Sequence, residues 1–528
     1  MTMKKIILFI LSLHFSFALF SQSSKTIICT SGNLCTLLTN SDRSSTTNLT
    51  LQGTIDARDF KTMRDSMPYL AVLDLSGVSI EAYSGYNGTY YSNTFTNFPA
   101  NEIPIQAFYG SKNIGVGKYS LKTIILPSTI TSIGHDAFNT CINLTGIITF
   151  PATLLSIGEN AFCYTNNISS YSIPASITSI GTHAFAGSSG SININALNNN
   201  YSSLDGILFN KNQTSLIQCP ILKSGIYTIP NTVNTIGDYA FEKCSLLTSI
   251  VCPSILNSIG NSAFSNATNL NSLNLSPSIN SIGQYAFNNC SSLTSINIPQ
   301  FVTTINEGVF YGCNKLEEVT IQSKLTAIGV AAFYECFKLK AITIPQTVTS
   351  IGRLAFKACN SLDSINIPDY VTTIGTGAFY DCTGLKAIYA SPVFPVDISS
   401  SITVFGNVDT VNCILHVGAG SVSEYRAANQ WRVFNIIEAE HILYYKVGLS
   451  EINQSISVYP NPSKTNFKIK ISGEASVLIY SLNGTMLINQ QIIDNELIST
   501  DNLSTGVYIM KIIHNNSITT QRLIIDKN

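Results

Sequence analysis

The feature that most constrains the fold is a six-residue motif, Ile-Gly-x-x-Ala-Phe, that recurs through the middle of the chain. From Phe241 onward its phenylalanine returns every 23 residues, and the first two steps are 24 and 23 residues. The phenylalanines in this position are Phe138, Phe162, Phe185, Phe241, Phe264, Phe287, Phe310, Phe333, Phe356 and Phe379. A unit this short cannot bury its own apolar side, but a stack of units can. The sequence therefore predicts a solenoid, interrupted once where 56 residues separate Phe185 from Phe241.

Each repeat divides into two short β segments and a turn. In one clear unit, the alternation of Ile296 and Ile298 predicts a short strand with one buried face. Pro299 ends it, because proline cannot donate to a ladder. A second segment, as at 348–351, is followed by Gly352, which allows a sharp turn. We expect the Ala-Phe pair that follows to form a short helical or 3₁₀ turn, with the phenylalanine pointing inward.

Most of the 13 cysteines follow the repeat. Seven lie three residues after a motif phenylalanine, namely Cys141, Cys244, Cys290, Cys313, Cys336, Cys359 and Cys382. A row at repeat spacing predicts one small, buried, apolar slot that is filled again and again, rather than a disulfide framework. Cys29 and Cys35 could pair locally or stay free.

The first 21 residues have the pattern of a signal peptide. Lys4 and Lys5 form a basic start, and residues 6–20 form an apolar stretch interrupted by His14. This stretch is too short to span a bilayer comfortably. No later segment offers about 18 uncharged apolar residues, so we expect no transmembrane anchor once the signal is removed.

Composition indicates an extracellular β protein. Charged residues make up only 11% of the chain, so Ser, Thr and Asn must cover most of its surface. The net charge of −1 gives no general attraction to nucleic acid.

The sequence offers no catalytic constellation. His135 and His183, two of the six histidines, fall at variable positions of the motif, where we expect solvent exposure. Neither a His-Glu-x-x-His nor a Gly-x-Ser-x-Gly motif nor a phosphate-binding glycine loop occurs. The sequence therefore predicts that the protein is not an enzyme and uses no cofactor or metal.

The repeat spacing and its Ile-Pro, Ile-Gly and Ala-Phe pairs resemble the BspA-type leucine-rich repeats of bacterial surface proteins. The resemblance covers residues 121–438. Within it, residues 200–211 resemble a hairpin common in that family, and residues 421–431 resemble its closing cap. This cap should be a helix that buries Tyr425 and Trp431, the one tryptophan of the chain.

Residues 22–120 are less regular and are predicted to be the N-terminal cap of the solenoid. Residues 49–55 read as a strand, and Asp56 could cap a helix from Ala57 to about Asp65. Phe108 ends a degenerate first copy of the motif, and residues 82–98 are expected to form a loop.

A linker is predicted at 439–452 and a small β-sandwich at 453–528, because short strands alternate there with turns. This region resembles the C-terminal sorting domain of the type IX secretion system of Bacteroidetes. The residues that carry the resemblance are Tyr459, Pro460, Asn461, Pro462, Gly484, Gly506 and Tyr508. The resemblance implies contact with that secretion machinery and a secreted or outer-surface location.

Two groups of residues are candidates for a ligand face. One is the outward row of the longer strands, formed by Asn274, Asn297, Thr320, Thr343, Asn366 and Tyr389, and the other is the tyrosine group Tyr83, Tyr86 and Tyr90, which Tyr91 follows. A neighbouring row, Glu317, Lys340, Asp363 and Lys386, alternates in charge and predicts cross-strand ion pairs. Such rows could hold a protein or glycan ligand, or only keep the sheet soluble and in register.

Two functions remain open at this point. The first is an adhesin-like, secreted or cell-surface binding protein, which the family resemblance implies. The alternative is a structural spacer of the cell surface or matrix without a specific partner.

Overall fold

The structure is a computed structural model of the whole chain. It describes residues 23–90, 94–110, 116–322, 324–399, 403–418, 420–438, 457–459, 463–470, 473–481, 486–493, 496–514 and 517–527. The predicted signal peptide, the predicted linker and Tyr91 lie outside these ranges. The chain divides into two units, Met1–Tyr444 and Tyr445–Asn528, and each is described by itself.

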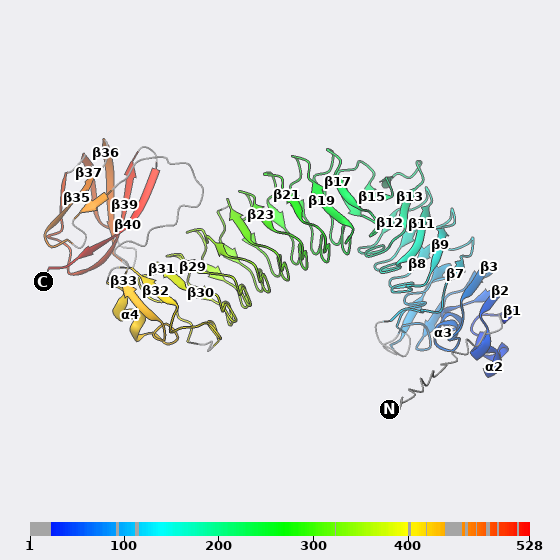
Figure 1. Ribbon diagram of the computed structural model, residues 1–528. Helices are drawn as coiled ribbons and strands as arrows, with labels where there is room; N and C mark the ends of the chain where they lie inside the picture. The colour runs from blue at the N-terminus through cyan, green and yellow to red at the C-terminus, as the bar shows by residue number, and fades with distance from the viewer. Residues whose placement is uncertain are drawn as a thin grey trace, which may run out of the picture. The chain divides into compact units, whose positions relative to one another are not determined.

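The first unit is a stack of coils joined by parallel β-pairing (Figure 1). We call one side the long-strand face. Its strands are β1 (Ser24–Cys29), β2 (Asn48–Ile55), β3 (Val72–Ile80), β7 (Thr123–Ile125), β9 (Thr145–Thr149), β11 (Asn167–Ile173), β13 (Ser191–Ile194), β17 (Gly225–Thr228), β19 (Leu247–Val251), β21 (Ser272–Asn274), β23 (Ser295–Ile298), β25 (Glu318–Ile321), β27 (Ala341–Ile342), β29 (Ser364–Ile367), β31 (Ala387–Ala390), β32 (Ile414–Val417) and β33 (Asn435–Glu438). The predicted β-rich solenoid is confirmed.

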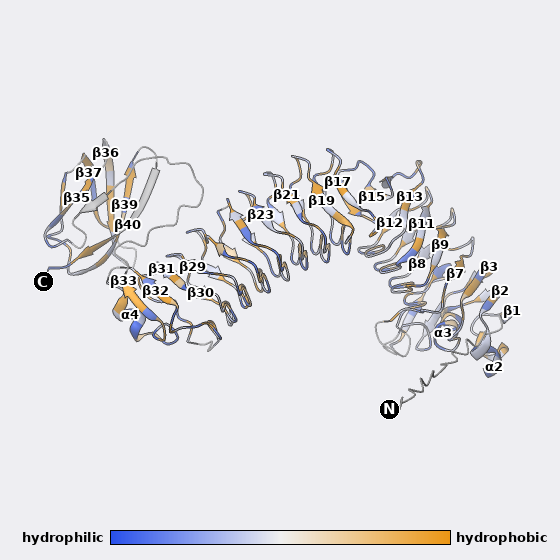
Figure 2. Cartoon of the chain, in the orientation of Figure 1, coloured by the Kyte–Doolittle hydropathy of each residue, from blue (hydrophilic) through white to orange (hydrophobic). Residues whose placement is uncertain are grey.

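The other side, the short-strand face, carries the Ser/Thr-Ile segments of the repeat. Its strands are β6 (Glu102–Ile103), β8 (Ser132–Ile133), β10 (Ser156–Ile157), β12 (Ser179–Ile180), β16 (Ser215–Gln218), β18 (Thr235–Ile236), β20 (Ser258–Ile259), β22 (Ser281–Ile282), β24 (Thr304–Ile305), β26 (Ala327–Ile328), β28 (Ser350–Ile351) and β30 (Thr373–Ile374). Hydrophobic and hydrophilic residues alternate along these coils (Figure 2), so each coil presents its apolar side chains to the space between the two faces.

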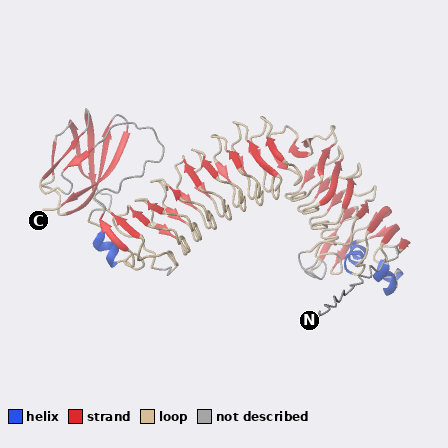
Figure 3. Cartoon of the chain, in the orientation of Figure 1, coloured by secondary structure: helices blue, strands red, loops and turns tan. Residues whose placement is uncertain are grey.

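The turn after each motif glycine is a row of β-turns, so the predicted short helical or 3₁₀ turn was wrong. In the Phe356 coil, Ala355 N–H donates to the Gly352 carbonyl at 3.3 Å, and Cys359 N–H donates to the Phe356 carbonyl at 3.1 Å. Leu354 and Ala358 take φ of 58° and 60°. A helix needs negative φ at successive residues, so left-handed residues four positions apart prevent one. Figure 3 shows helices only near the two ends of the described coils.

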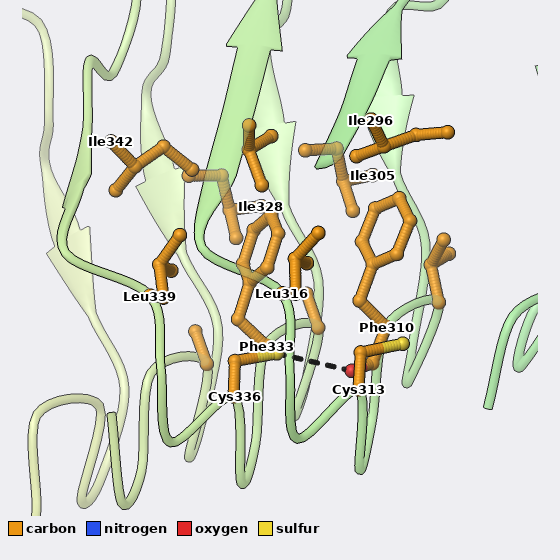
Figure 4. Close-up of a cluster of buried hydrophobic side chains, with 14 of the residues drawn as sticks. Ile296, Ile305, Phe310, Cys313, Leu316, Ile328, Phe333, Cys336, Leu339 and Ile342 are labelled. Atoms are coloured by element: carbon orange, nitrogen blue, oxygen red, sulfur yellow. Dashed lines mark hydrogen bonds between the residues drawn. The ribbon is translucent and has the colours of Figure 1, made fainter. Parts of the chain in front are cut away.

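The motif phenylalanines form a column of stacked rings inside the coils. The Phe310 and Phe333 rings lie 5.3 Å apart at an interplanar angle of 14° (Figure 4). The column extends beyond the predicted copies, because Phe108 stacks on Phe138 at 5.3 Å and Phe405 stacks on Phe379 at 5.5 Å. Aromatic contacts of this kind add to the free energy gained by burying apolar area.

The cysteine row occupies buried positions beside this column, as predicted. Cys336 Sγ donates to the Phe310 carbonyl at 3.2 Å (Figure 4), and Cys359 Sγ donates in the same way to the Phe333 carbonyl. The slot therefore also provides a weak hydrogen bond to a carbonyl in the preceding coil. All 13 cysteines lie in described residues and all are free thiols, including Cys29 and Cys35.

Thiol labelling of the folded protein is expected to modify Cys35 rapidly and the other cysteines at least about 100-fold more slowly. Cys35 is exposed, whereas burial raises the pKa of Cys313 and of Cys252 to about 12. Mass spectrometry after timed iodoacetamide labelling at pH 8 measures this. Labelling in urea, which should modify all 13 thiols, is the control. Rapid labelling of the Cys290–Cys382 row in the native state would contradict the buried-slot interpretation.

The interruption between Phe185 and Phe241 contains a hairpin, as predicted from residues 200–211. Strands β14 (Tyr201–Leu204) and β15 (Ile207–Asn210) pair antiparallel, and β15 pairs antiparallel with β16. Strand β15 separates two hydrophobic cores, because Leu208 packs into the N-terminal core while Ile207 and Phe209 pack into the C-terminal core. The solenoid is therefore divided at this point in its sheets as well as in its interior, since neither β12 nor β13 pairs with a strand that follows it.

Side-chain contacts connect the coils on either side of the interruption. The Tyr164 hydroxyl donates to the Glu242 carboxylate at 2.7 Å, and the Lys243 ammonium lies 3.5 Å from the centre of the Tyr164 ring. Burial raises the pKa of the Glu242 carboxyl above its usual range. Keeping the Glu242 carboxylate charged in the folded protein therefore costs desolvation free energy.

Glu242→Gln is expected to stabilise the protein at pH 8 by about 1 kcal/mol, near the low end of the cost of burying a polar group. The unfolded chain loses the Glu242 proton at lower pH than the folded chain does. The stability of the wild-type protein therefore falls as pH rises through the raised pKa. Glutamine keeps an acceptor for Tyr164 but does not titrate. Urea unfolding at pH 4 and pH 8 measures the difference, which should vanish at pH 4. An equal gain at both values would contradict it.

The N-terminal cap is built on helix α3 (Ala57–Asp65), which begins at Asp56 as predicted. Asp56 and Asp59 form a capping box. Lys118 closes the other end, because its buried ammonium donates to the Met67 carbonyl at 2.7 Å. Helices α1 (Leu34–Leu37) and α2 (Asn40–Ser45) precede α3. The expected loop at 82–98 instead contains a hairpin of β4 (Tyr83–Gly85) and β5 (Thr96–Phe98).

The closing cap is helix α4 (Val422–Ala427), and it buries Tyr425 and Trp431 as predicted. The Tyr425 hydroxyl donates to the Pro392 carbonyl at 2.9 Å, and the Trp431 indole N–H donates to the Val396 carbonyl at 2.9 Å. Both polar tips are therefore satisfied inside the core. Strand β33 follows this helix and pairs in parallel with β32.

The second unit is a small β-sandwich, as predicted. One sheet contains β34 (Ser457–Tyr459), β35 (Asn466–Lys470) and β38 (Leu497–Ser499). The other contains β36 (Glu474–Tyr480), β37 (Met486–Ile493), β39 (Gly506–His514) and β40 (Ser517–Ile525). Residues from both sheets, among them Phe467, Ile498, Val477 and Met510, form one core.

Candidate functional site on the long-strand face

The predicted outward row lies on adjacent strands of the long-strand face. Asn297 pairs in register with Thr320, and Asn366 pairs with Tyr389. Asn274, Asn297, Thr320 and Thr343 are exposed, whereas Asn366 and Tyr389 are half-buried. Neighbouring strands lie about 4.8 Å apart, so the row is a continuous polar strip across successive coils.

Asn366 serves the backbone of its own sheet, which the sequence did not reveal. Its side-chain amide donates to the Ile344 carbonyl at 2.9 Å, and its side-chain oxygen accepts from Ile344 N–H at 2.9 Å. Strand β27 ends at Ile342, so this side chain supplies the hydrogen bonds that a longer neighbouring strand would supply. Asn366 is therefore a structural residue, and we withdraw it from the ligand candidates.

Tyr389 lies in an aromatic pair that the sequence revealed only in part. Its ring stacks on His416, with centroids 4.6 Å apart and an interplanar angle of 16°. The two residues pair in register on β31 and β32, and Ile437 pairs next to His416 and is 40% exposed. Burial lowers the pKa of His416, which favours the neutral ring. His416 was missed because it lies 27 residues after Tyr389 rather than 23.

The charged row beside this strip forms the predicted ion pairs. Lys340 lies 2.6 Å from Glu317, and Lys386 lies 2.8 Å from Asp363. All four side chains are strongly exposed, so each pair contributes little stability in water. Their main effect is to keep this part of the face hydrophilic and the strands in register.

The three N-terminal tyrosines do not form one surface. Tyr83 stacks on Phe98 at 6.1 Å, and the Arg58 guanidinium lies 4.7 Å from its ring centre. Tyr90 packs edge-on against His135. Tyr86 alone is 57% exposed, and it contacts Phe95, which is 58% exposed. Among the described aromatic residues of this region, the Tyr86–Phe95 pair between β4 and β5 is the most exposed to a ligand, and Phe95 was missed because no repeat marks it.

A second aromatic row follows the motif phenylalanines on the outside of the turns. Tyr311 and Tyr334 stack at 4.7 Å, and the Lys357 ammonium lies 5.2 Å from the Tyr334 ring and 5.1 Å from the Tyr380 ring. The sequence signal was present, since each residue directly follows a motif phenylalanine. These rings cover one another, so this row presents mainly its edges and hydroxyl groups.

His183 differs from the prediction of an exposed position. It is half-buried, its ring centre lies 3.6 Å from that of Tyr239, and burial lowers its pKa. Within the described part of the chain, no group of three His, Cys, Asp or Glu side chains is placed to hold a metal ion. No helix among the described residues is long and apolar enough to cross a membrane.

The sorting-domain residues are described only in part. Tyr459 ends β34 and Gly506 begins β39, while Pro460, Asn461, Pro462 and Gly484 lie outside the described residues. The Tyr508 hydroxyl donates to the Ser504 carbonyl at 2.9 Å. This bond ties the start of β39 to the turn before it.

Comparison with known families follows this division of the chain. The model of the BspA type leucine rich repeat region matches residues 101–228, 212–340 and 326–407, which together exceed half of the chain. The chain belongs to the BspA-type leucine-rich-repeat family. The model of the secretion system C-terminal sorting domain matches residues 457–526. This repeat protein therefore carries a sorting signal of the type IX system, which directs export to the cell surface or the medium.

Solved structures of bacterial repeat proteins are similar to this chain. A leucine-rich repeat protein from Eubacterium ventriosum is 23% identical and covers 62% of this chain and 88% of its own, with a TM-score of 0.49. The pneumococcal vaccine antigen PcpA is 17% identical over 80% of this chain and 90% of its own, with a TM-score of 0.40. A leucine-rich repeat protein from Bacteroides ovatus is 25% identical and covers 61% of this chain and 87% of its own, with a TM-score of 0.33. No curated protein matches in sequence.

Proposed function

We propose that this repeat protein is an adhesin-like binding protein of the cell surface. Its ligand site is the long-strand face around Tyr389 and His416, and its ligand is a protein or a glycan. The observation that carries the proposal is the stacked Tyr389–His416 pair, with Ile437 exposed beside it, next to the polar and charged rows of strands β23–β31. Aromatic side chains next to a polar rim are typical of binding hot spots.

The inward and outward positions of the coils are under different constraints. Inward positions repeat the same residues and hold the core together, so they have little freedom to vary. Outward positions along β23–β32 change from Asn and Thr to Tyr and His. Core packing does not require this change. The sorting domain supports the proposal, because it directs this face to the outside of the cell.

The test uses the mature full chain on a glycan array and on a panel of extracellular matrix proteins. We expect saturable binding that Tyr389→Ala combined with His416→Ala weakens at least about tenfold, the loss of one hot spot. The matched control is Glu317→Ala with Lys340→Ala, an exposed pair on the same face. Uniform absence of binding would favour the spacer alternative. Equal losses in both double variants would contradict the assignment to Tyr389 and His416.

A further inference from the structure

In an uninterrupted coil, the turn donates three backbone N–H groups to the next coil. The N–H groups of Tyr239, Phe241 and Lys243 donate to the carbonyls of Asn261, Ala263 and Ser265 at 2.9, 2.7 and 2.8 Å. The corresponding groups before the interruption belong to His183, Phe185 and Gly187. None of these three has a hydrogen-bond acceptor among the residues that the structure describes.

The reason is that the coil that follows lacks its turn. Strand β16 is in place, because Ser215 and Leu216 pair in register with Thr235 and Ile236. Beyond it the chain reads Gln-Cys-Pro-Ile at 218–221, with no Gly-x-x-Ala-Phe segment. Cys219 N–H donates to the Ala240 carbonyl, as the missing turn would, at 2.7 Å. The backbone carbonyls of Asp238 and Glu242, two residues before and after Ala240, accept no hydrogen bond within the described coils.

A cavity of about 220 Å³ lies where the turn is missing. It opens to one side and is lined by His183 and Phe185 from the coil before it, by Leu208 and Gln218 from the insertion, and by Asp238 from the coil after it. Phe185 is 2% exposed, and His183 Nε2 is buried without a partner. Buried N–H groups in proteins are nearly always paired, so the cavity wall has donors that nothing in the described part of the chain uses.

The space around the glycines at the edge of this cavity also reflects the missing turn. A Cβ at Gly260 would lie 2.5 Å from Asp238 N, against the backbone of the preceding coil. A Cβ at Gly237 would meet nothing closer than the Leu216 carbonyl oxygen at 3.1 Å. The backbone of the preceding coil therefore lies farther from Gly237 than from Gly260.

We propose that this cleft binds the main chain of a partner peptide, which supplies the missing turn. Carbonyls two residues apart in the peptide accept from the N–H groups of His183 and Phe185, which line the cleft, and one peptide N–H reaches the Asp238 carbonyl. Donors at every second residue match a peptide backbone, whose carbonyls recur at that spacing, better than they match a sugar or a single ion. The site lies at the interruption and is separate from the Tyr389–His416 site.

The size of the cavity limits what enters. It is smaller than the roughly 300–1,000 Å³ of a typical small-molecule pocket, so only a short stretch of small residues enters it, and the bulky residues of a longer peptide stay outside. The apolar wall of Phe185 and Leu208 excludes charged residues from the buried end.

The first test needs no variant. Hydrogen exchange followed by mass spectrometry on the mature full chain should show faster exchange at His183, Phe185 and Gly187 than at Tyr239, Phe241 and Lys243. The probe is a synthetic nonapeptide with the sequence of residues 258–266, the turn of a neighbouring coil. Saturation with it should slow exchange at the His183 and Phe185 amides at least about tenfold, as new hydrogen bonds form. Equal protection of both sets in the free protein would overturn the proposal.

Two tryptophan variants test the location. Ile217→Trp, at the lining of the cavity, should lower affinity for the nonapeptide at least about tenfold, whereas Ile226→Trp, at a position 72% exposed on the long-strand face, should not. Protection by the peptide in Ile217→Trp equal to wild type, or no protection at 1 mM peptide, would overturn the proposal. Protection by chitotetraose but not by the peptide would show that the ligand is a sugar, and this would also overturn the proposal.

Discussion

Phe310→Ala is expected to lower the free energy of unfolding by about 3–5 kcal/mol, the usual cost of deleting a buried phenylalanine. The Phe310 ring is fully buried and lies between Phe287 and Phe333, at 5.6 and 5.3 Å. Each coil contacts only its neighbours, so one truncation opens a cavity and weakens two interfaces at once. The loss should therefore exceed that of an isolated core position.

Urea unfolding measures this effect, followed by backbone circular dichroism and by the fluorescence of Trp431, the single tryptophan. Trp431 belongs to the same hydrophobic core as Phe310, so it reports the coils in question. The matched control is Phe301→Ala, nine residues away in sequence but 57% exposed, which should cost less than about 1 kcal/mol. Similar losses in the two variants would show that the ring column does not stabilise the stack.

Gly352→Ala is expected to destabilise the protein by about 3 kcal/mol, the upper range for overpacking a close contact. A Cβ at this corner would lie 2.5 Å from Gly329 C and 2.6 Å from Val330 N. Both atoms are backbone atoms of the preceding coil, so the coils themselves would have to separate. The cause is steric, since the motif glycine sets how closely one coil approaches the next.

Gly237→Ala is the matched control for this prediction. It changes the same motif position, but the nearest atom to the new methyl would lie 3.1 Å away because the preceding turn is missing. We expect a loss of less than about 1 kcal/mol. Melting temperature and hydrogen exchange of residues 329–353 report the difference. Equal effects at the two glycines would show that coil spacing does not depend on this contact.

Sequence periodicity predicted the solenoid, the inward phenylalanines and the buried cysteine slots because these depend on spacing along the chain alone. A ring that recurs every 23 residues on a unit too small to fold alone can only be buried by stacking. The helix that begins at Asp56 and the cap that buries Trp431 were predicted for a similar reason, since their signals are local.

The candidate site was less predictable because it depends on which neighbours meet. Asn366 looked like an outward ligand residue, but the short strand β27 leaves Ile344 for it to pair with. Tyr83 looked available, but Phe98 and Arg58 cover it. His416 carries half of the aromatic pair and lies outside the 23-residue spacing, so no count along the chain could find it.

The sequence by itself determined that this chain stacks into leucine-rich-repeat coils and that a sorting domain follows them. Only the tertiary structure decided that the turns are rows of β-turns with left-handed residues. It also decided which outward side chains are free, and that one coil lacks its turn and leaves His183 and Phe185 facing a cavity. The physical reason is that repeat spacing specifies which side chains each coil buries. Unpaired backbone N–H groups arise where two coils meet, so they depend on both coils and cannot be predicted from the sequence of one.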